Sequence, residues 1–276
     1  MIKELAVKRI KPLVSVGVWQ ALRRIHPRKR PSPVTDVRPG LTELAVKYGT
    51  DKWGRHRYTP HYEFHLSHLK DESFTLLEIG IGGYKRKRAG GASLRMWKEY
   101  FGHAQILGLD IEDKSFVNED RIRAYQGSQV DTTLLRDIVR DAENLRVVID
   151  DGSHRNDHVL KTFADLFPML PDDVIYIIED TETSYRESYG GSPHLAAQGT
   201  TMNLVKGLLD GLNYVEYTGP GYQPSYSERH VVGVHAYHNL VVIEKGLNDE
   251  ERSRGPFTPE ELAAVAADHQ DGGGIA

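Results

Sequence analysis

The chain has 276 residues, of which 39% are hydrophobic and 27% charged, values that are ordinary for a globular protein. Its formal net charge of −4 excludes a global basic field that would attract nucleic acid, so we expect no nucleic-acid partner. It has no cysteine, which excludes disulfides, thiolate metal ligands and cysteine nucleophiles, and fits a reducing, cytoplasmic location. No apolar run reaches the roughly 20 residues that a membrane span needs.

Residues 1–40 are predicted to be a basic arm and linker. Lysines and arginines dominate residues 1–31, where Glu4 is the single acidic residue. The apolar segment 13–19 is too short for a secretory signal and lacks a small-residue cleavage site. The arm would be solvated or packed on a partner subunit, and contact with an anionic membrane stays an alternative.

From residue 41 onward, short apolar runs alternate with amphipathic stretches, which predicts a Rossmann-like α/β domain over 41–247. We expect a mostly parallel sheet with helices on both faces. The predicted helices are 41–48, Pro60 to about 70, 93–101, 132–142, 158–170 and 202–212. The predicted strands are 74–79, 105–109, a segment before Gly127, 145–149, 174–178, and an antiparallel C-terminal pair, 231–235 and 239–244. Residues 248–276 are predicted to be a tail whose capping box, 258–261, starts one last helix.

The first strand runs into a glycine turn at residues 76–83. Gly80 and Gly82 let the backbone approach a ligand closely. A dinucleotide fingerprint needs a third glycine where Lys85 stands, which argues against a nicotinamide oxidoreductase. With Glu78 before it, the turn resembles the first motif of S-adenosylmethionine methyltransferases, in which the acidic residue orients the amino acid end of the cofactor. A tight turn without a ligand is the alternative.

Two further segments suit a cofactor. The second strand ends at Asp110, a position from which a carboxylate can accept both ribose hydroxyls. Gln129 lies in a polar loop, 127–131, that could address an adenine ring. An ordinary aspartate at the end of a strand is the alternative for Asp110.

Paired carboxylates end two consecutive strands, Asp150 with Asp151 and Glu179 with Asp180. Because the carboxyl ends of parallel strands meet at one edge of a sheet, these groups would repel one another without a cation. Oxygen ligands without cysteine suit magnesium. Simple helix caps are the alternative.

His154 follows Asp151 by three residues, on the turn into the next helix. Histidine is the side chain suited to general base work near neutral pH. A capping or surface histidine is the alternative, and His158 could face the same way.

Together these motifs resemble the metal-dependent sugar O-methyltransferases of macrolide tailoring, the mycinamicin type, and more loosely the cephalosporin-hydroxylase-like group. The resemblance runs from about residue 41 to 245. It rests on segments 49–52, 58–63, 77–83, 93–97, 127–129, 150–154 and 178–181. It implies a class I methyltransferase fold, S-adenosylmethionine and Mg²⁺ as cofactors, and a homo-oligomer.

The resemblance also implies roles for single residues. Asp151, Glu179 and Asp180 would hold the metal, and His154 would deprotonate a sugar hydroxyl of a glycosylated small molecule. The cofactor would be surrounded by Glu78, Gly80, Ser93, Asp110, Gln129 and Asp150. The large auxiliary domain of the mycinamicin-type enzymes has no counterpart in this sequence, so neither the substrate nor the oligomer number is implied.

Two other functions stay open. A catechol-type methyltransferase would use the same metal chemistry on an aromatic diol. The other is a methyltransferase fold that serves as a non-catalytic scaffold. A scaffold would have no use for Asp151, His154, Glu179 and Asp180, so these residues argue against it. Residues 185–198 and 219–229 are predicted to be substrate lids, or else long surface loops, and their tyrosines suit sugar or polyketide faces.

Overall fold

The computed structural model describes residues 38–84, 88–217 and 219–252. The predicted basic arm and the predicted helix after residue 258 lie outside them. The described residues of 38–214 and 223–248 form one compact unit, which carries the sheet and all the predicted site residues. In the second unit, the rings of Tyr217 and Tyr222 lie 5.1 Å apart, and Arg252 pairs with Glu216 at 3.4 Å. No helix in the described part of the chain is long and apolar enough to cross a membrane.

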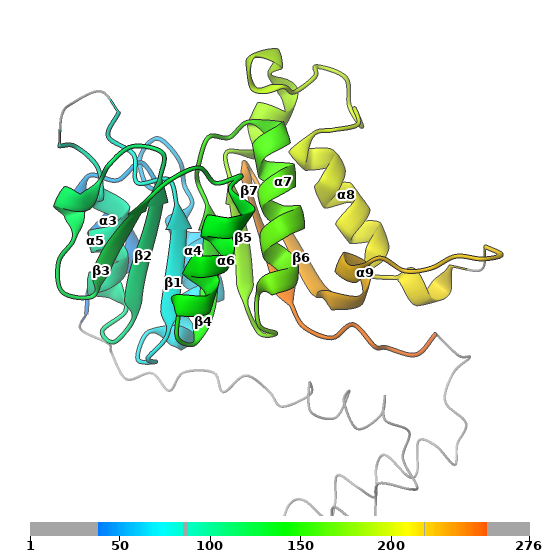
Figure 1. Ribbon diagram of the computed structural model, residues 1–276, viewed down its shortest axis with the longest axis horizontal. Helices are drawn as coiled ribbons and strands as arrows, with labels where there is room; N and C mark the ends of the chain where they lie inside the picture. Colours follow the sequence, from blue (N-terminus) through cyan, green and yellow to red (C-terminus); the bar gives the residue numbers. More distant parts are fainter. Residues whose placement is uncertain (1–37, 85–87, 218, 253–276) are drawn as a thin grey trace, which may run out of the picture. The chain divides into compact units, whose positions relative to one another are not determined.

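Seven strands form one mixed sheet in the order β3-β2-β1-β4-β5-β7-β6 (Figure 1). The strands are β1 Thr75–Ile79, β2 Gln105–Asp110, β3 Ile122–Gln126, β4 Leu145–Asp150, β5 Ile175–Glu179, β6 Val231–Tyr237 and β7 Leu240–Lys245. Strands β1 to β5 run parallel to one another, and β7 runs antiparallel to both β5 and β6. The predicted mixed sheet with an antiparallel C-terminal pair is confirmed.

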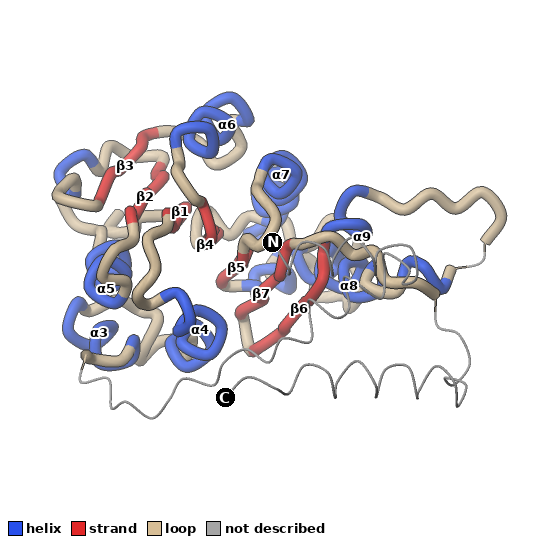
Figure 2. The backbone as a smooth tube through the Cα atoms, turned by 90° about the horizontal axis from the view of Figure 1, so that it is seen from below, coloured by secondary structure: helices blue, strands red, loops and turns tan. Residues whose placement is uncertain are grey.

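Helices cover both faces of the sheet, as predicted. The helices are α3 Leu41–Tyr48, α4 Thr59–Leu66, α5 Ala92–Tyr100, α6 Thr132–Asp141, α7 Asn156–Leu166, α8 Thr201–Gly211 and α9 Tyr226–His230. Figure 2 shows α3, α4 and α5 on one side of the strands and α6 and α7 on the other. One apolar core packs Tyr62 and Trp97 against the first face, and a second packs Phe163 and Val205 against the other.

Local backbone chemistry accounts for most differences in helix bounds. The helix predicted over 158–170 begins at Asn156 and ends at Leu166, because Pro168 has no N–H and the chain continues as the 3₁₀-helix η3, Phe167–Met169. Likewise α4 gives way to the 3₁₀-helix η1, Ser67–Leu69. Helix α9 and the 3₁₀-helices η4 (Thr181–Tyr185) and η5 (Glu187–Tyr189) were not predicted. They are too short to show a hydrophobic period.

The topology places the predicted site. The chain runs from β1 outward through β2 to β3, then returns to add β4 and β5 on the other side of β1. This reversal leaves a crevice beyond the carboxyl ends of β1 and β4, which is where open α/β sheets bind ligands. The glycine turn follows β1, and the carboxylate pairs end β4 and β5. All the predicted site residues except Ser93, on α5, therefore lie in the last two residues of a strand or in the loop that follows it.

Candidate active site

The glycine turn lies directly against the loop that follows β4. Gly80 has a φ of 97°, and a Cβ built on it would lie 2.0 Å from the carbonyl oxygen of Asp151. The N–H of Gly80 donates to Leu109 at 2.7 Å, and the N–H of Asp151 donates to Ile79 at 2.9 Å. The close approach of these backbones therefore requires glycine at position 80.

A cavity of about 430 Å³ opens beside this turn. It is lined by Gly49, Thr50, Asp51, Gly80, Ile81, Gly82, Gly83, Tyr84, Gly90, Ala92, Ser93, Asp151, Gly152 and His154. Five predicted site residues are among them. The residues at 49–51, from the loop after α3, and Tyr84 are additions for which no role was predicted.

Glu78 and Asp110 lie just behind the cavity wall and hold its residues in place. The Ser93 hydroxyl donates to Glu78 at 2.8 Å. Asp110 accepts hydrogen bonds from the N–H of Ile81 at 2.8 Å and from the Tyr84 hydroxyl at 3.0 Å. Burial raises the pKa of Glu78, which is fully enclosed. Both carboxylates are therefore near enough to shape a cofactor pocket, and their direct contact with a cofactor stays a prediction.

Gln129 and Asp150 are not part of the cavity lining. The Gln129 amide donates to Asp150 at 3.1 Å, and its oxygen accepts from the N–H of Ser153 at 2.8 Å. A Cβ on Gly152, which does line the cavity, would meet the Gln129 oxygen at 2.4 Å. Burial raises the pKa of Asp150 to about 6. Through these contacts, Gln129 and Asp150 support the loop 150–153 from the interior of the protein. Their predicted contact with the cofactor stays untested.

Lys52 is a central residue of the site for which no role was predicted. Its side chain is fully buried, and its ammonium lies 2.8 Å from Asp151, 3.0 Å from Glu78 and 2.5 Å from Glu179. Burial lowers the pKa of this ammonium, but the three carboxylates outweigh burial and hold it well above 10.5. Lys52 is therefore the cation that makes this packing of acids tolerable.

Sequence reasoning missed Lys52 because nothing local marks a loop lysine as buried. The excess of acidic groups at the edge of the sheet did predict a nearby cation, and we assigned that charge to a metal alone. Segment 49–52 also belongs to the motifs of the family resemblance, which was the one signal that could have drawn attention to this lysine.

A second cluster forms around His154. Its Nε2 lies 4.0 Å from Oδ1 of Asp151 and 3.6 Å from Oδ2 of Asp180. The Tyr58 hydroxyl donates to the other oxygen of Asp180 at 2.8 Å. His154 and Asp180 both have left-handed backbones, with φ values of 57° and 52°. Such conformations are uncommon outside glycine and aim both side chains at the same point.

The residues around Lys52 and those around His154 are two candidate positions for a divalent cation. One ligand atom each from Asp151, His154 and Asp180 lie within 4.8 Å of one another, and so do atoms from Glu78, Asp151 and Glu179. The second group already encloses the Lys52 ammonium. The first group includes Asp151 and His154 of the cavity lining, and its two aspartates offer hard oxygen ligands, which suit Mg²⁺.

The predicted ligand Glu179 faces the lysine. One of its oxygens accepts from both Lys52 and the Tyr62 hydroxyl. Burial and the nearby Asp151 raise the pKa of Glu179 well above 4.5. Its place in a metal site, alongside Asp151 and Asp180, stays a prediction.

Similar proteins were found by sequence, although no model of a known protein family matches the chain. Demethylmacrocin O-methyltransferase of Streptomyces fradiae is 44% identical over 236 residues, which cover 84% of this chain and 60% of that protein. Mycinamicin VI 2''-O-methyltransferase of Micromonospora griseorubida is 45% identical over 216 residues, which cover 77% of this chain and 54% of that protein. The chain therefore spans less than two thirds of the length of these relatives.

The fold agrees with the sequence comparison. The solved structure of MycE methyltransferase from the mycinamycin biosynthetic pathway, in complex with Mg, SAH and mycinamycin VI, matches with a TM-score of 0.76 at 43% identity. The match covers 83% of this chain and 60% of that one. By sequence and by fold, the chain is thus a homologue of the sugar O-methyltransferases of macrolide and tetracenomycin pathways, and its sheet and helices form a class I methyltransferase domain.

Proposed function

We propose that the chain is an S-adenosylmethionine- and Mg²⁺-dependent O-methyltransferase that acts on a sugar hydroxyl of a glycosylated natural product. The observation that carries the proposal is the convergence of Asp180 with Asp151 and His154, two residues that line the cavity beside the glycine turn. The relatives named above support the reaction class, and the Mg and SAH bound in the MycE structure support both cofactors.

The cavity offers the features that a nucleoside cofactor needs. Gly80 and Gly82 present bare backbone, Ser93 is held by Glu78, and the Asp110 carboxylate lies behind Ile81. Bound there, S-adenosylmethionine supplies a methyl group already activated by its sulfonium. The enzyme's contribution is then mostly to hold the substrate oxygen in line with that methyl group.

Asp151 and Asp180, with Glu179 as the third predicted ligand, would hold the metal. A Mg²⁺ ion held there would supply Lewis acidity, which makes a nearby sugar hydroxyl easier to deprotonate. His154 accepts the hydroxyl proton at Nε2, the ring nitrogen that faces both aspartates. Those carboxylates then stabilise the positive charge on the ring. Tyr58 keeps Asp180 turned toward His154 through its hydrogen bond.

Buried Asn156 orders one of the two predicted lids. Its amide donates to the carbonyl oxygens of Thr183 and Tyr189 at 3.1 and 3.0 Å, and its oxygen accepts from the N–H of Thr201 at 2.7 Å. Segment 185–198 is therefore tied to the start of α7 at one end and enters α8 at the other. We propose that segment 185–198 faces the substrate. As a separate proposal, the enzyme is a cytoplasmic homo-oligomer.

The test is calorimetric titration of S-adenosylmethionine, with and without Mg²⁺, followed by methylation assays on a panel of glycosides and catechols. Turnover of glycosides that requires Mg²⁺ supports the proposal. Turnover of aromatic diols alone would move the assignment to the catechol type. Well-folded protein that binds neither cofactor would instead indicate a scaffold.

A further inference from the structure

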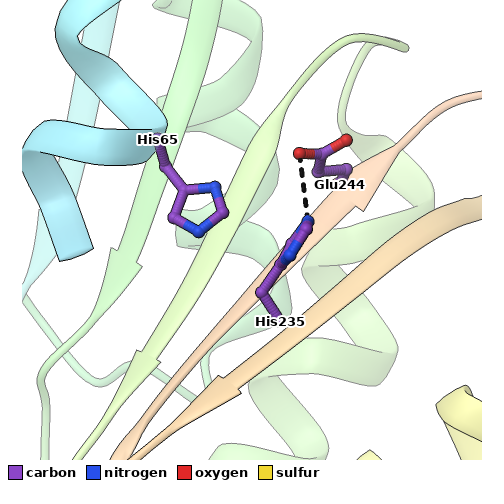
Figure 3. Close-up of side chains that lie close together, drawn as sticks. All are labelled: His65, His235 and Glu244. Atoms are coloured by element: carbon purple, nitrogen blue, oxygen red, sulfur yellow. Dashed lines mark ion pairs between the residues drawn. The ribbon is translucent and has the colours of Figure 1, made fainter.

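A third group of side chains that could hold a metal ion lies at the edge of the sheet, outside the cavity lining. It consists of His65 on α4, His235 on the edge strand β6 and Glu244 on β7 (Figure 3). Glu244 pairs with Ile175 at the start of β5, whereas Glu179 ends that strand. Four residue steps of about 3.3 Å separate the two positions, roughly 13 Å along the strand. This group is therefore distinct from the proposed active site.

Its geometry is close to that of a coordination sphere. Nε2 of His235 lies 3.3 Å from Oε1 of Glu244, and one ligand atom from each of the three residues lies within 4.8 Å of the others. Tetrahedral zinc, with bonds of about 2.0–2.2 Å, separates its ligand atoms by roughly 3.3–3.5 Å. His235 and Glu244 already have this separation, and a shift of at most about 1.5 Å would bring His65 to it.

The surroundings hold the ring of His65 in place. Its Nε2 lies 2.9 Å from the Tyr237 hydroxyl, and the Tyr237 ring stacks on His61 with the centroids 3.8 Å apart. Ligating histidines in proteins almost always have such a partner on the second ring nitrogen, which fixes the tautomer and the orientation of the ring. Tyr237 occupies that position here.

One of the three residues is buried, and the other two are accessible to solvent. His65 is 1% exposed, whereas the side chains of His235 and Glu244 are 39% and 25% exposed. An ion can therefore reach the group, and water can complete its coordination. Two imidazoles with one carboxylate favour zinc or a similar transition metal over Mg²⁺, which prefers oxygen ligands alone.

We propose that His65, His235 and Glu244 form a zinc-type metal site that fastens α4 to the β6–β7 hairpin. His65 is far in the sequence from the β6–β7 hairpin that carries His235 and Glu244, so a bound ion would cross-link the helix to the edge of the sheet. The site is independent of the proposed methyl transfer, because none of its residues belongs to the cavity or to the clusters around Lys52 and His154.

The test is titration of untagged full-length protein with Zn²⁺ alone, followed by calorimetry and by X-ray absorption at the zinc edge. The Asp151→Asn variant serves as the parent, because it disables the ion site next to His154. We expect this parent to bind one Zn²⁺ with two imidazole ligands. Adding His235→Ala should weaken binding at least about 100-fold, and Tyr237→Phe about tenfold, since loss of the partner of a ligand costs 10–100-fold.

His103→Ala is the matched control, because His103 is an exposed histidine outside the group. It should leave Zn²⁺ affinity unchanged. Glu244→Gln, which keeps the shape of the side chain, guards against an alanine variant that fails to fold, and it should also weaken binding. The proposal is overturned if the parent binds no Zn²⁺, or if His235→Ala and Glu244→Gln bind it as tightly as the parent. Both results would leave the methyltransferase assignment untouched.

Discussion

The ammonium of Lys52 lies 2.8 Å from Oδ2 of Asp151, although 99 residues separate them in the chain. The same nitrogen reaches Glu78, assigned to the cofactor, and Glu179, assigned to the metal. One buried lysine thus joins the two halves of the proposed active site. Loss of the Lys52 side chain itself is therefore expected to disturb both halves.

Replacing Lys52 with methionine should destabilise the protein strongly. The variant keeps most of the side-chain volume but leaves Glu78, Asp151 and Glu179 without their shared cation. Breaking a buried ion pair by removing one partner costs about 3–5 kcal/mol. Urea unfolding at pH 7 measures the loss, with Lys206→Met as a partly buried control. An unchanged midpoint would show that Lys52 is not the counter-ion of these acids.

Asp151→Asn should separate metal binding from cofactor binding. The amide keeps the shape of the side chain but removes a charged ligand that faces both Lys52 and His154. We expect Mg²⁺-dependent turnover to fall by roughly 100-fold or more, while the affinity for S-adenosylhomocysteine changes little. Calorimetry and a methylation assay measure the two effects, with the exposed Asp210→Asn as control. Full activity in Asp151→Asn would rule out the metal role.

His154→Ala should slow methyl transfer without unfolding the site. A positioned general base contributes about 10²–10⁴-fold to a rate, and the turnover number should fall by that factor. His158→Ala is the matched control, because His158 hydrogen-bonds to Ser153 and is not among the residues that line the cavity. Single-turnover kinetics at saturating Mg²⁺ distinguish the two variants. Equal losses in both would mean that His154 has no special part in the chemistry.

Gly80→Ala and Gly207→Ala should have opposite effects on stability. At Gly80 a Cβ would collide with the Asp151 carbonyl at 2.0 Å, so the turn must open and cofactor binding is lost. Gly207 lies within helix α8 with nothing within 4 Å of a new Cβ, and alanine there should stabilise by up to about 1 kcal/mol. Thermal unfolding of the two variants checks both signs. A stable, cofactor-binding Gly80→Ala protein would contradict the close approach.

The pH dependence of stability should include a contribution from Asp165. Hydrogen bonds from Lys161 and then from Thr132 lower its pKa below 3.8, and they tie α6 to α7. Because the folded state favours the charged form, this contribution is present above pH 3.8 and is lost as the pH falls through the lowered pKa. Asp165→Asn should therefore lose stability at pH 7, by less than about 1 kcal/mol for so exposed a pair, and the loss should be smaller at pH 2.5. Urea unfolding at both values tests this, and a gap that does not narrow in acid would contradict it.

The fold was largely readable from the sequence because each element carries its own signal. Strands β1 and β5 are buried along their whole length, and their apolar runs showed this directly. The 3₁₀-helices and α9 have no such period, so they were missed. The carboxylate pairs were found because the ends of parallel strands converge by geometry alone.

Contacts made by the loop after α3 were beyond sequence reasoning. Lys52 gains its role from Glu78, Asp151 and Glu179, three residues on other segments, and no local pattern encodes that meeting. Gln129 shows the converse. Its loop does follow β3 at the carboxyl edge of the sheet, but its amide donates to Asp150 and it does not line the cavity, so its predicted contact with the cofactor stays untested.

Because β7 lies between β5 and β6 in the sheet, the loop after β5 depends on a hairpin that is synthesised late. The turn between β6 and β7 supplies Asn239, whose carbonyl oxygen accepts from the Tyr58 hydroxyl at 3.1 Å and from the N–H of Thr181 at 3.3 Å. The helix that positions Tyr58 leaves the ribosome about 180 residues before this partner. The loop after β5, which carries Asp180, therefore lacks part of its support until the hairpin has been synthesised and has packed against it. Pauses in translation ahead of residue 231 would lengthen the time during which these acids are exposed to chaperones and proteases.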